Sequence, residues 1–500
     1  MLVAPAVLGV TSLLVVTRRG AYLTPDALAY VGTARNIAHG HGFTPPPGSP
    51  PVSNFAPLYT LVLAAGSLLG ADPLTVARYL NPLVFGATIV LVGLLVRRLT
   101  GSLALAVVAQ ALVLSGRDFL AYHSAALSEP LFVLFALLAL ATLAVFSSRG
   151  GNARLLTASL FAAAAGLTRY VGLAVAAAGA AALMLFARDR RPWKAVAIFL
   201  ALALLPLLVW LAWAGGEAKG INRSPVLHAP GLSYLSRGVE TASRWVLPSD
   251  APWPVQAAAL VLVAAGLLWA ARASRPRGAQ SAERDRRRSA LAGVLGLFSA
   301  AYLLALIGDR TLFDVTGRLD ARFLLPVHAT ALALAAWALR AVDLRHSRLA
   351  QLGVGAFVGV QLVSGSLWIT DAATDAAVRP GGFAAPEWVQ SQVIADTRAL
   401  APSVPVFTND VGALFFHTGR VAEAVPEKAI PLTGRANRAY DAQIHAMAAS
   451  LRRGGVVLYL TAAPARRVFL PTPAEIVGRL GLKEVTRDRV GVLYRMPGGP

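Results

Sequence analysis

Hydrophobic runs recur along the chain from residue 2 to about residue 370 and then stop. A helix needs about 20 predominantly apolar residues to cross a bilayer, and some of these runs reach that length while others approach it. The runs cover residues 2–16, 79–96, 102–114, 130–146, 155–167, 172–186, 195–213, 255–271, 290–307, 323–339 and 352–369. The pattern predicts a polytopic α-helical membrane protein with about 11 transmembrane helices, within limits of about 9 and 13, in a domain that covers residues 1–370.

Basic residues orient these runs. They gather in alternate connections, at positions 97–98, 149–154, 188–194, 272–288 and 340–348. Cytoplasmic loops of membrane proteins carry an excess of Lys and Arg, so we expect these connections in the cytoplasm and the chain in the plasma (inner) membrane. The other connections, at 18–78, 115–129, 168–171, 214–254, 308–322 and everything after 370, are then expected on the external side.

Two features of the sequence do not fit this topology directly. Arg18 and Arg19 follow the first run and would lie outside, against the rule for basic residues. That run lacks a basic leading segment and a small-residue cleavage site, so we interpret it as an anchor rather than a signal peptide. The apolar run 56–69 is too short to span, and counting it as a span would invert every later basic loop; we expect an interfacial or re-entrant helix on the external face.

Residues 371–500 have a different pattern. Helical spacing is found at 387–400 and 435–452, and short apolar runs typical of buried strands at 404–408, 456–460 and 490–494. Pro and Gly separate these segments. The pattern predicts a small C-terminal α/β domain on the external side.

Composition narrows the class of protein. Of 500 residues, 56% are hydrophobic and only 14% are charged, against about 25% charged in a soluble domain, which excludes a soluble enzyme. Lys and Arg number 46 and Asp and Glu 25, a net charge of +21, but the basic residues concentrate in the predicted cytoplasmic loops. They indicate contact with the lipid bilayer and no nucleic-acid partner. The absence of Cys excludes disulfides and cysteine nucleophiles.

Acidic residues are scarce, so the two at predicted external span ends stand out. Asp26 follows Thr24-Pro25, and a helix that begins there would use Thr24 as its cap and Asp26 to balance the helix dipole. Glu129 in Ser128-Glu129-Pro130 has the same structural explanation at the start of a span. The functional alternative is a pair of carboxylates at the membrane surface, where a buried carboxylate needs a cationic partner.

Arg169, Arg318 and Arg322 lie on the predicted external side, where basic residues are not favoured. Arg318 and Arg322 are four residues apart, so a helix would present both on one face. Guanidinium groups suit bidentate recognition of phosphate. The structural alternative is snorkelling, or pairing with Asp320 or Asp314.

A series of short motifs in this order resembles the glycosyltransferase-C superfamily, especially the dolichyl-phosphate-mannose mannosyltransferase and aminoarabinose transferase branch. An acid after the first span is followed by Tyr30, Arg35 and a Gly-His-Gly turn, then by Pro57-Leu58-Tyr59. The further motifs are Ser128-Glu129-Pro130-Leu131-Phe132, Gly166-Leu167-Thr168-Arg169-Tyr170, Arg318-Leu319-Asp320-Ala321-Arg322-Phe323, Phe407-Thr408-Asn409-Asp410 and His417-Thr418-Gly419-Arg420. The resemblance covers most of the chain.

The resemblance implies an enzyme that transfers a sugar, with inversion, from a polyprenyl-phosphate donor to a glycan, lipid or protein acceptor outside the membrane. Asp26 corresponds to the general base of the family. We expect Glu129 as the second catalytic residue, a carboxylate that positions the acceptor. We expect substrate-binding residues that comprise Arg169, Arg318, Arg322, Tyr30, Tyr59 and His123. Many relatives have a second acid beside the first, where this chain has Ala27.

No cofactor is assigned. His39 and His41 could approach Asp26, but no third metal ligand is identifiable, so a divalent metal ion is left as an alternative and no metal residues are named. Other functions remain open: a lipid-linked glycan ligase or polymerase, a lipid or solute transporter, and a scaffold without catalysis. A transporter would favour ionisable residues inside its spans, and the runs here are nearly free of them.

Overall fold

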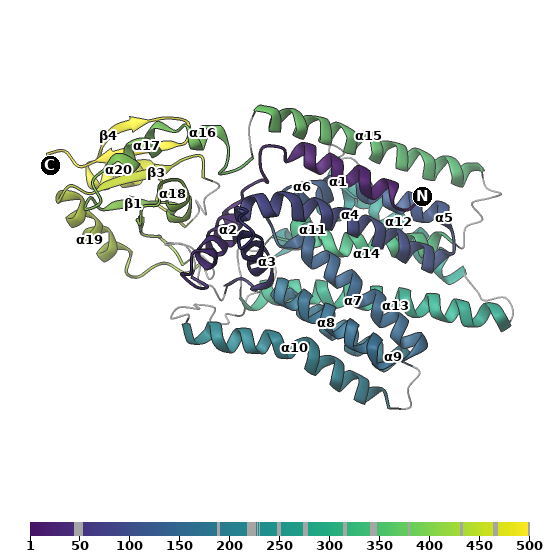
Figure 1. Ribbon diagram of the computed structural model, residues 1–500. Helices are drawn as coiled ribbons and strands as arrows, with labels where there is room; N and C mark the ends of the chain where they lie inside the picture. The colour runs from purple at the N-terminus through teal and green to yellow at the C-terminus, as the bar shows by residue number, and fades with distance from the viewer. Residues whose placement is uncertain are drawn as a thin grey trace.

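The computed structural model describes residues 1–44, 54–187, 191–217, 227, 229, 231–247, 252–273, 279–313, 318–340, 348–378, 381–430, 434–463 and 469–498. Helices fill the chain up to residue 378 (Figure 1). They are α1 (Ala4–Val16), α2 (Pro25–Ala38), α3 (Leu58–Ser67), α4 (Pro73–Thr100), α5 (Leu103–Ser115), α6 (Arg117–His123), α7 (Glu129–Arg149), α8 (Asn152–Thr168), the 3-10 turn Tyr170–Gly172, α9 (Leu173–Phe186), α10 (Pro192–Glu217), α11 (Leu232–Ser243), α12 (Trp253–Ala273), α13 (Ala279–Leu312), α14 (Ala321–Leu339) and α15 (Arg348–Val378).

Every predicted apolar run falls on one of these helices. Within the described residues, 6 helices are long and apolar enough to cross a membrane, namely α4, α7, α10, α13, α14 and α15. Helices α5 and α6 pass the same test together, but they are bent by 58° where Gly116 separates them. Helices α1, α9 and α12 are apolar but shorter, so a mostly helical membrane protein is supported and the number of 11 spans stays a prediction.

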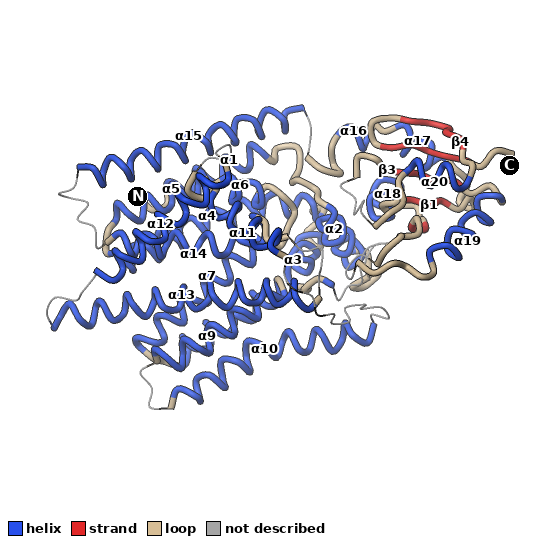
Figure 2. Tube along the Cα trace, turned by 180° about the vertical axis from the view of Figure 1, so that it is seen from behind, coloured by secondary structure: helices blue, strands red, loops and turns tan. Residues whose placement is uncertain are grey.

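The short run at 56–69 forms helix α3, as expected of a non-spanning segment. It packs between α2 and the first turns of α4, where Gly66 lies directly against Val76; a Cβ on Gly66 would come within 2.4 Å of a Val76 methyl carbon. Figures 1 and 2 both show α2 and α3 at one end of the helix bundle, between the bundle and the C-terminal sheet.

Small residues let the long helices approach one another. At Gly86 of α4, a Cβ would lie 2.6 Å from a methyl carbon of Val10, so α1 can rest directly on α4. Helices α7 and α8 form an antiparallel pair, and α10 packs against α8 and α9. In both views α15 runs along one edge of the bundle and α10 along the opposite edge (Figure 2).

The C-terminal part contains one five-stranded sheet in the order β2-β1-β3-β5-β4. Its elements are α16 (Pro386–Val389), α17 (Gln392–Ala399), β1 (Val406–Thr408), α18 (Val411–Thr418), β2 (Glu423–Ala424), α19 (Tyr440–Arg452), β3 (Val456–Leu460), α20 (Pro473–Leu480), β4 (Lys483–Arg487) and β5 (Gly491–Arg495). Strand β1 pairs in parallel with β2 and β3, and β5 is antiparallel to β3 and β4.

Three details of this part correct the sequence prediction. The single helix expected at 387–400 is broken into α16 and α17, because Ser391 leaves the helix and caps α17 through Ile394 N. The helix expected from residue 435 begins only at Tyr440. Strand β4 was not predicted because it is an exposed edge strand without alternating apolar residues.

Short backbone bridges join the two ends of the chain. After α1, Tyr22 pairs in parallel with Ala125 before α7, and Leu23 pairs in parallel with Gly382 at the start of the C-terminal part. One hydrophobic cluster includes α2, α3, the start of α7 and the inner face of the sheet. The sheet and the helices share this core, so the division into two domains at residue 370 remains a proposal. The external position of residues 371–500 is also a proposal.

Candidate functional site

Helix α2 presents Asp26 in its first turn. Thr24 caps the helix by accepting a hydrogen bond from Ala27 N at 3.2 Å, and Pro25 occupies the first helical position, as the sequence predicts. The bridges on either side of Leu23 fix the backbone just before this turn. The Asp26 side chain is 36% exposed, so its carboxylate lies at the edge of the site and is accessible to a substrate.

Glu129 is the first residue of α7 and its side chain is only 3% exposed. Its Oε1 atom accepts hydrogen bonds from Arg169, at 2.5 Å, and from Nε of Arg322. Its Oε2 atom is buried and has no hydrogen-bond partner among the described residues. Glu129 therefore holds two arginines with one oxygen and leaves the other available.

Arg322 connects both carboxylates. Its Nη1 atom lies 2.6 Å from Oδ2 of Asp26, while its Nε atom donates to Glu129. Asp320 caps α14 by accepting from the backbone nitrogen of Arg322 at 3.1 Å, which fixes the direction in which the helix begins. The charges of two arginines and two carboxylates cancel, so the cluster of Asp26, Glu129, Arg169 and Arg322, here the charge cluster, is neutral.

Aromatic and hydroxyl groups form a layer beside the charge cluster. The hydroxyl groups of Tyr30 and Ser128 lie 3.0 Å apart, and Arg169 donates to the Ser128 hydroxyl at 3.3 Å. Burial raises the pKa of the Tyr30 hydroxyl, so it stays protonated at neutral pH. Its ring packs edge-on against those of Tyr59 and Phe55, with centroids at 5.3 and 4.9 Å. Tyr30 therefore lies next to the charge cluster, and Tyr59 packs against the ring of Tyr30.

Two predicted site residues lie elsewhere. His123 is fully buried between helices, with its ring 4.8 Å from that of Phe85 and its Nδ1 atom 2.7 Å from the Phe119 carbonyl oxygen, so it belongs to the core. Arg318 is exposed and precedes the first residue of α14, so the expectation that it shares a helical face with Arg322 is wrong. Asp314, the other suggested partner, lies outside the described residues.

The structure offers no metal site in the parts of the chain that it describes, where no group of three or more His, Asp or Glu side chains could hold an ion. His39 and His41 stack on one another, with centroids 6.4 Å apart, and the Nδ1 atom of His39 lies 2.7 Å from the carbonyl oxygen of Arg35. The two histidines thus form part of the turn that ends α2.

Several residues of the site carry no sequence signal of their own. Ser128 and Phe323 flank predicted residues, and both arginines lie over the Phe323 ring, at 5.8 and 5.9 Å. Tyr170 donates to the Phe55 carbonyl oxygen at 3.0 Å and accepts from the indole of Trp210 at 3.0 Å. The motif containing Arg169 and Tyr170 was the available signal, but the link to α10 is visible only in the structure.

The arrangement can bind an anion and accept a proton. Two guanidinium groups on rigid helix ends suit a phosphate, which would compete with the carboxylates for the same N–H donors. Asp26 can take a proton from a nearby hydroxyl group once its contact with Arg322 is exchanged for such an anion.

Comparisons with known proteins show what this chain is similar to. Residues 50–218 match the model of the family described as dolichyl-phosphate-mannose-protein mannosyltransferase. This stretch includes Glu129 and Arg169 but not Asp26 or Arg322. A comparison with curated proteins finds no match.

Several solved structures are similar to this chain in fold. ArnT from Cupriavidus metallidurans, in a crystal structure bound to undecaprenyl phosphate, is similar with a TM-score of 0.63 and 14% identity over 100% of this chain and 99% of ArnT. The archaeal oligosaccharyltransferase AglB from Archaeoglobus fulgidus, in complex with an inhibitory peptide and a dolichol-phosphate, gives a TM-score of 0.52 and 12% identity over 92% of this chain and 69% of AglB. The arabinofuranosyltransferase AftD from Mycobacteria gives 0.53 and 16% over 100% of this chain, which spans 40% of AftD. The resemblance to the glycosyltransferase-C superfamily is confirmed at the level of the fold.

Proposed function

We propose that the protein is an inverting glycosyltransferase that moves a sugar from a polyprenyl-phosphate donor to an acceptor hydroxyl group at the external face of the membrane. The observation that carries the proposal is the charge cluster, in which Arg322 joins Asp26 to Glu129 and Arg169.

Donor binding would use the two arginines. The phosphate of the donor is the leaving group, and fixed guanidinium groups next to it stabilise the charge that develops as the bond to the sugar breaks. Glu129 would keep both arginines in place through its Oε1 atom, because a carboxylate that is 3% exposed must stay paired.

The transfer step would use Asp26 as general base. The acceptor oxygen attacks the anomeric carbon of the sugar from the side opposite the phosphate, the bond between that carbon and the phosphate oxygen breaks, and Asp26 takes the acceptor proton. Polyprenyl phosphate leaves with the bonding electrons. Arg322 lies 2.6 Å from Asp26, so the donor phosphate would compete with Asp26 for this guanidinium group and free the carboxylate to take the acceptor proton.

Two of the similar structures support the donor class, because ArnT was crystallised with undecaprenyl phosphate and AglB with a dolichol-phosphate. The matching family model, named for a mannosyltransferase that uses dolichyl-phosphate mannose, points in the same direction. The sugar, and the choice among glycan, lipid and protein acceptors, are open to experiment.

The test is a transfer assay with radiolabelled polyprenyl-phosphate sugars, using wild type and the variants Asp26→Asn and Asp441→Asn in folded samples. Asp441 is a matched control because it also pairs with an arginine, Arg479, at 2.6 Å, yet it is 73% exposed in the C-terminal part. Loss of a general base lowers the rate by about 10²–10⁴-fold, so Asp26→Asn should be nearly inactive and Asp441→Asn unchanged. Equal transfer by both variants would remove Asp26 as the base.

A further inference from the structure

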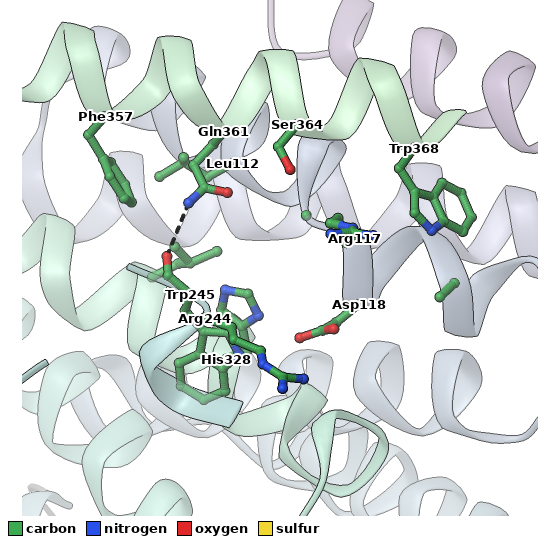
Figure 3. A pocket seen from close by; sticks show the side chains of 13 residues that line it. Leu112, Arg117, Asp118, Arg244, Trp245, His328, Phe357, Gln361, Ser364 and Trp368 are labelled. Carbon is green, nitrogen blue, oxygen red and sulfur yellow. Dashed lines mark hydrogen bonds between the residues drawn. The ribbon is translucent and has the colours of Figure 1, made fainter. Parts of the chain in front are cut away.

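A pocket of about 510 Å³ lies between α6 and α15 (Figure 3). Its volume is in the range of small-molecule sites. We name it the α6–α15 pocket. Four side chains of α15 form one wall, Asp118 the opposite wall, and Trp245 and His328 the floor; the α15 residues are Phe357, Gln361, Ser364 and Trp368.

One wall of this pocket belongs to a helix at the edge of the bundle. The spacing of the four α15 residues puts them on one helical face, whereas Val363 and Leu367, on another face of α15, are 61% and 60% exposed. Only 6% of the spanning window of α15 is buried inside the protein. Gln361 bridges the pocket by donating to the Trp245 carbonyl oxygen at 3.4 Å. An amphiphile could therefore leave its tail along α15, in the lipid, and its headgroup in the pocket.

Polar groups are concentrated here although the surrounding helices are apolar. Asp118, Arg117 and Arg244 line the pocket together with His328, which is 7% exposed. The Nδ1 atom of His328 is buried without a hydrogen-bond partner among the described residues, while its ring stacks on Trp245 at 4.3 Å. Ionisable residues at membrane depth are costly and usually mark a functional site.

The mixture of groups favours a sugar over a phosphate. A carboxylate, an amide and a hydroxyl group from Asp118, Gln361 and Ser364 can each bind sugar hydroxyl groups, and the indole and imidazole faces cover apolar surface. A phosphate would be repelled by Asp118. Arg244 is already engaged by Glu240 at 2.5 Å, and the remaining charges of the lining, Arg117 and Asp118, are opposite and offset one another, so the pocket has little net positive charge for an anion.

The pocket is also close to the charge cluster. Arg322, which contacts Asp26, and His328, which lines the pocket, both lie on α14 and are six residues apart. At 1.5 Å and about 100° per residue, the two positions are about 9 Å apart along the helix axis and about 120° apart around it, so an acceptor in the pocket would have to reach around the first turns of α14 to meet Asp26.

We propose that the α6–α15 pocket binds the sugar headgroup of an amphiphilic, glycolipid-like acceptor and delivers one hydroxyl group to Asp26. This inference rests on the proposed function, since only a transferase needs an acceptor. It assigns the acceptor to the α15 side of the bundle, and α10 lies along the opposite edge (Figure 1).

The test measures binding without transfer. The chain has no Cys, so a single Ser364→Cys protein, reconstituted in phosphatidylcholine vesicles, reports the pocket by its rate of labelling with a small thiol reagent. Leu367→Cys is the matched control on the same helix because that side chain is 60% exposed, away from the pocket. The probes share one tail: octyl glucoside, an octyl tetraethylene glycol ether and octyl phosphate.

We expect octyl glucoside alone to slow labelling at position 364, and no probe to slow it at position 367. Adding Asp118→Asn should raise the half-protective concentration of octyl glucoside by about 10–100-fold, because a hydrogen bond to a charged group is lost. Protection by the ether as strong as that by the glucoside, or protection by octyl phosphate instead, would overturn the proposal, as would protection that Asp118→Asn leaves unchanged.

The two proposals can fail separately. Asp26→Asn in the Ser364→Cys protein should keep the protection and lose transfer. If protection is absent while transfer still depends on Asp26, the acceptor pocket is wrong and the transferase stands. If protection is present while Asp26→Asn transfers normally, the pocket binds sugars and the proposed chemistry is wrong.

Discussion

Replacing Glu129 by glutamine tests whether one buried carboxylate holds both arginines of the charge cluster. The amide keeps the shape but removes the charge, and it leaves Arg169 and Arg322 with side chains that are only 14% and 22% exposed. Breaking a buried ion pair by removing one partner costs about 3–5 kcal/mol. Asp26 can still neutralise Arg322, but Arg169 loses the carboxylate with which it pairs. We therefore expect Glu129→Gln to lower the free energy of unfolding by about this amount.

The partner variant should cost less. In Arg169→Gln, Glu129 keeps its contact with Arg322, and the loss is that of a charged hydrogen bond, about 1.5–3 kcal/mol. In the double variant both positions carry a neutral glutamine, so neither substitution leaves an unpaired charge at the other position. The double variant should therefore be more stable than the sum of the two losses predicts, by about 0.5–3 kcal/mol.

The measurement is thermal unfolding in one detergent at constant pH, followed by the fluorescence of the nine tryptophans. Glu283→Gln is the control, because Glu283 and Arg287 form an i,i+4 pair with side chains 41% and 46% exposed, worth less than about 1 kcal/mol. Strictly additive shifts in Tm, or a Glu129→Gln shift no larger than that of the control, would refute the description of the charge cluster as one coupled unit.

Three further results are expected. Gly382→Ala should lower Tm, because Gly382 has a φ of +69° and an added Cβ would lie 2.2 Å from the Leu23 carbonyl oxygen; an unchanged Tm would contradict the tight bridge at this point. Burial lowers the pKa of His417 from 6.5 to about 4. Between pH 6.5 and pH 4 the imidazole is therefore protonated in the unfolded chain but neutral in the folded protein. The free energy of unfolding should fall by up to about 1.4 kcal/mol for each pH unit below 6.5, down to pH 4. The difference in Tm between wild type and His417→Phe, measured from pH 7 to pH 4, should show this slope, and a constant difference would rule it out. In oriented vesicles, a single Cys at Ile430 should react with an impermeant thiol reagent from the external side and one at Ser281 only after permeabilisation; labelling of both from the same side would reject the proposed topology.

Apolar runs were enough to predict the long apolar helices, because the length and composition of each run depend on local sequence alone, but not shorter helices such as α11 and α20. They were also enough for β3, whose five residues are all buried, but not for β4, which is exposed and is held by its pairing with β5. The break between α16 and α17 depends on Asp488, which accepts a hydrogen bond from Ser391 at 2.7 Å across 97 positions of sequence. Local patterns contain no information on such a contact.

Part of the site was predictable because charged residues are rare in this chain. Asp26, Glu129, Arg169 and Arg322 stood out because they are charged residues at the ends of apolar runs, and the structure brings all four together. Their pairing was not predictable, because it depends on which helix ends meet. His123 is buried beside Phe85, and its place among the substrate-binding residues stays a prediction.

The order of the charge cluster along the chain has a consequence for biosynthesis. Translation delivers Glu129 and Arg169 at the same end of the α7–α8 hairpin, so these two charges can neutralise each other as the hairpin enters the membrane, where an isolated charge costs about 2.5–3.5 kcal/mol. Arg322, which pairs with Asp26 in the folded protein, arrives much later, at the start of α14. A ribosome must therefore complete α14 before the two halves of the site can join, and a nascent chain released earlier would be inserted, partly neutralised and inactive.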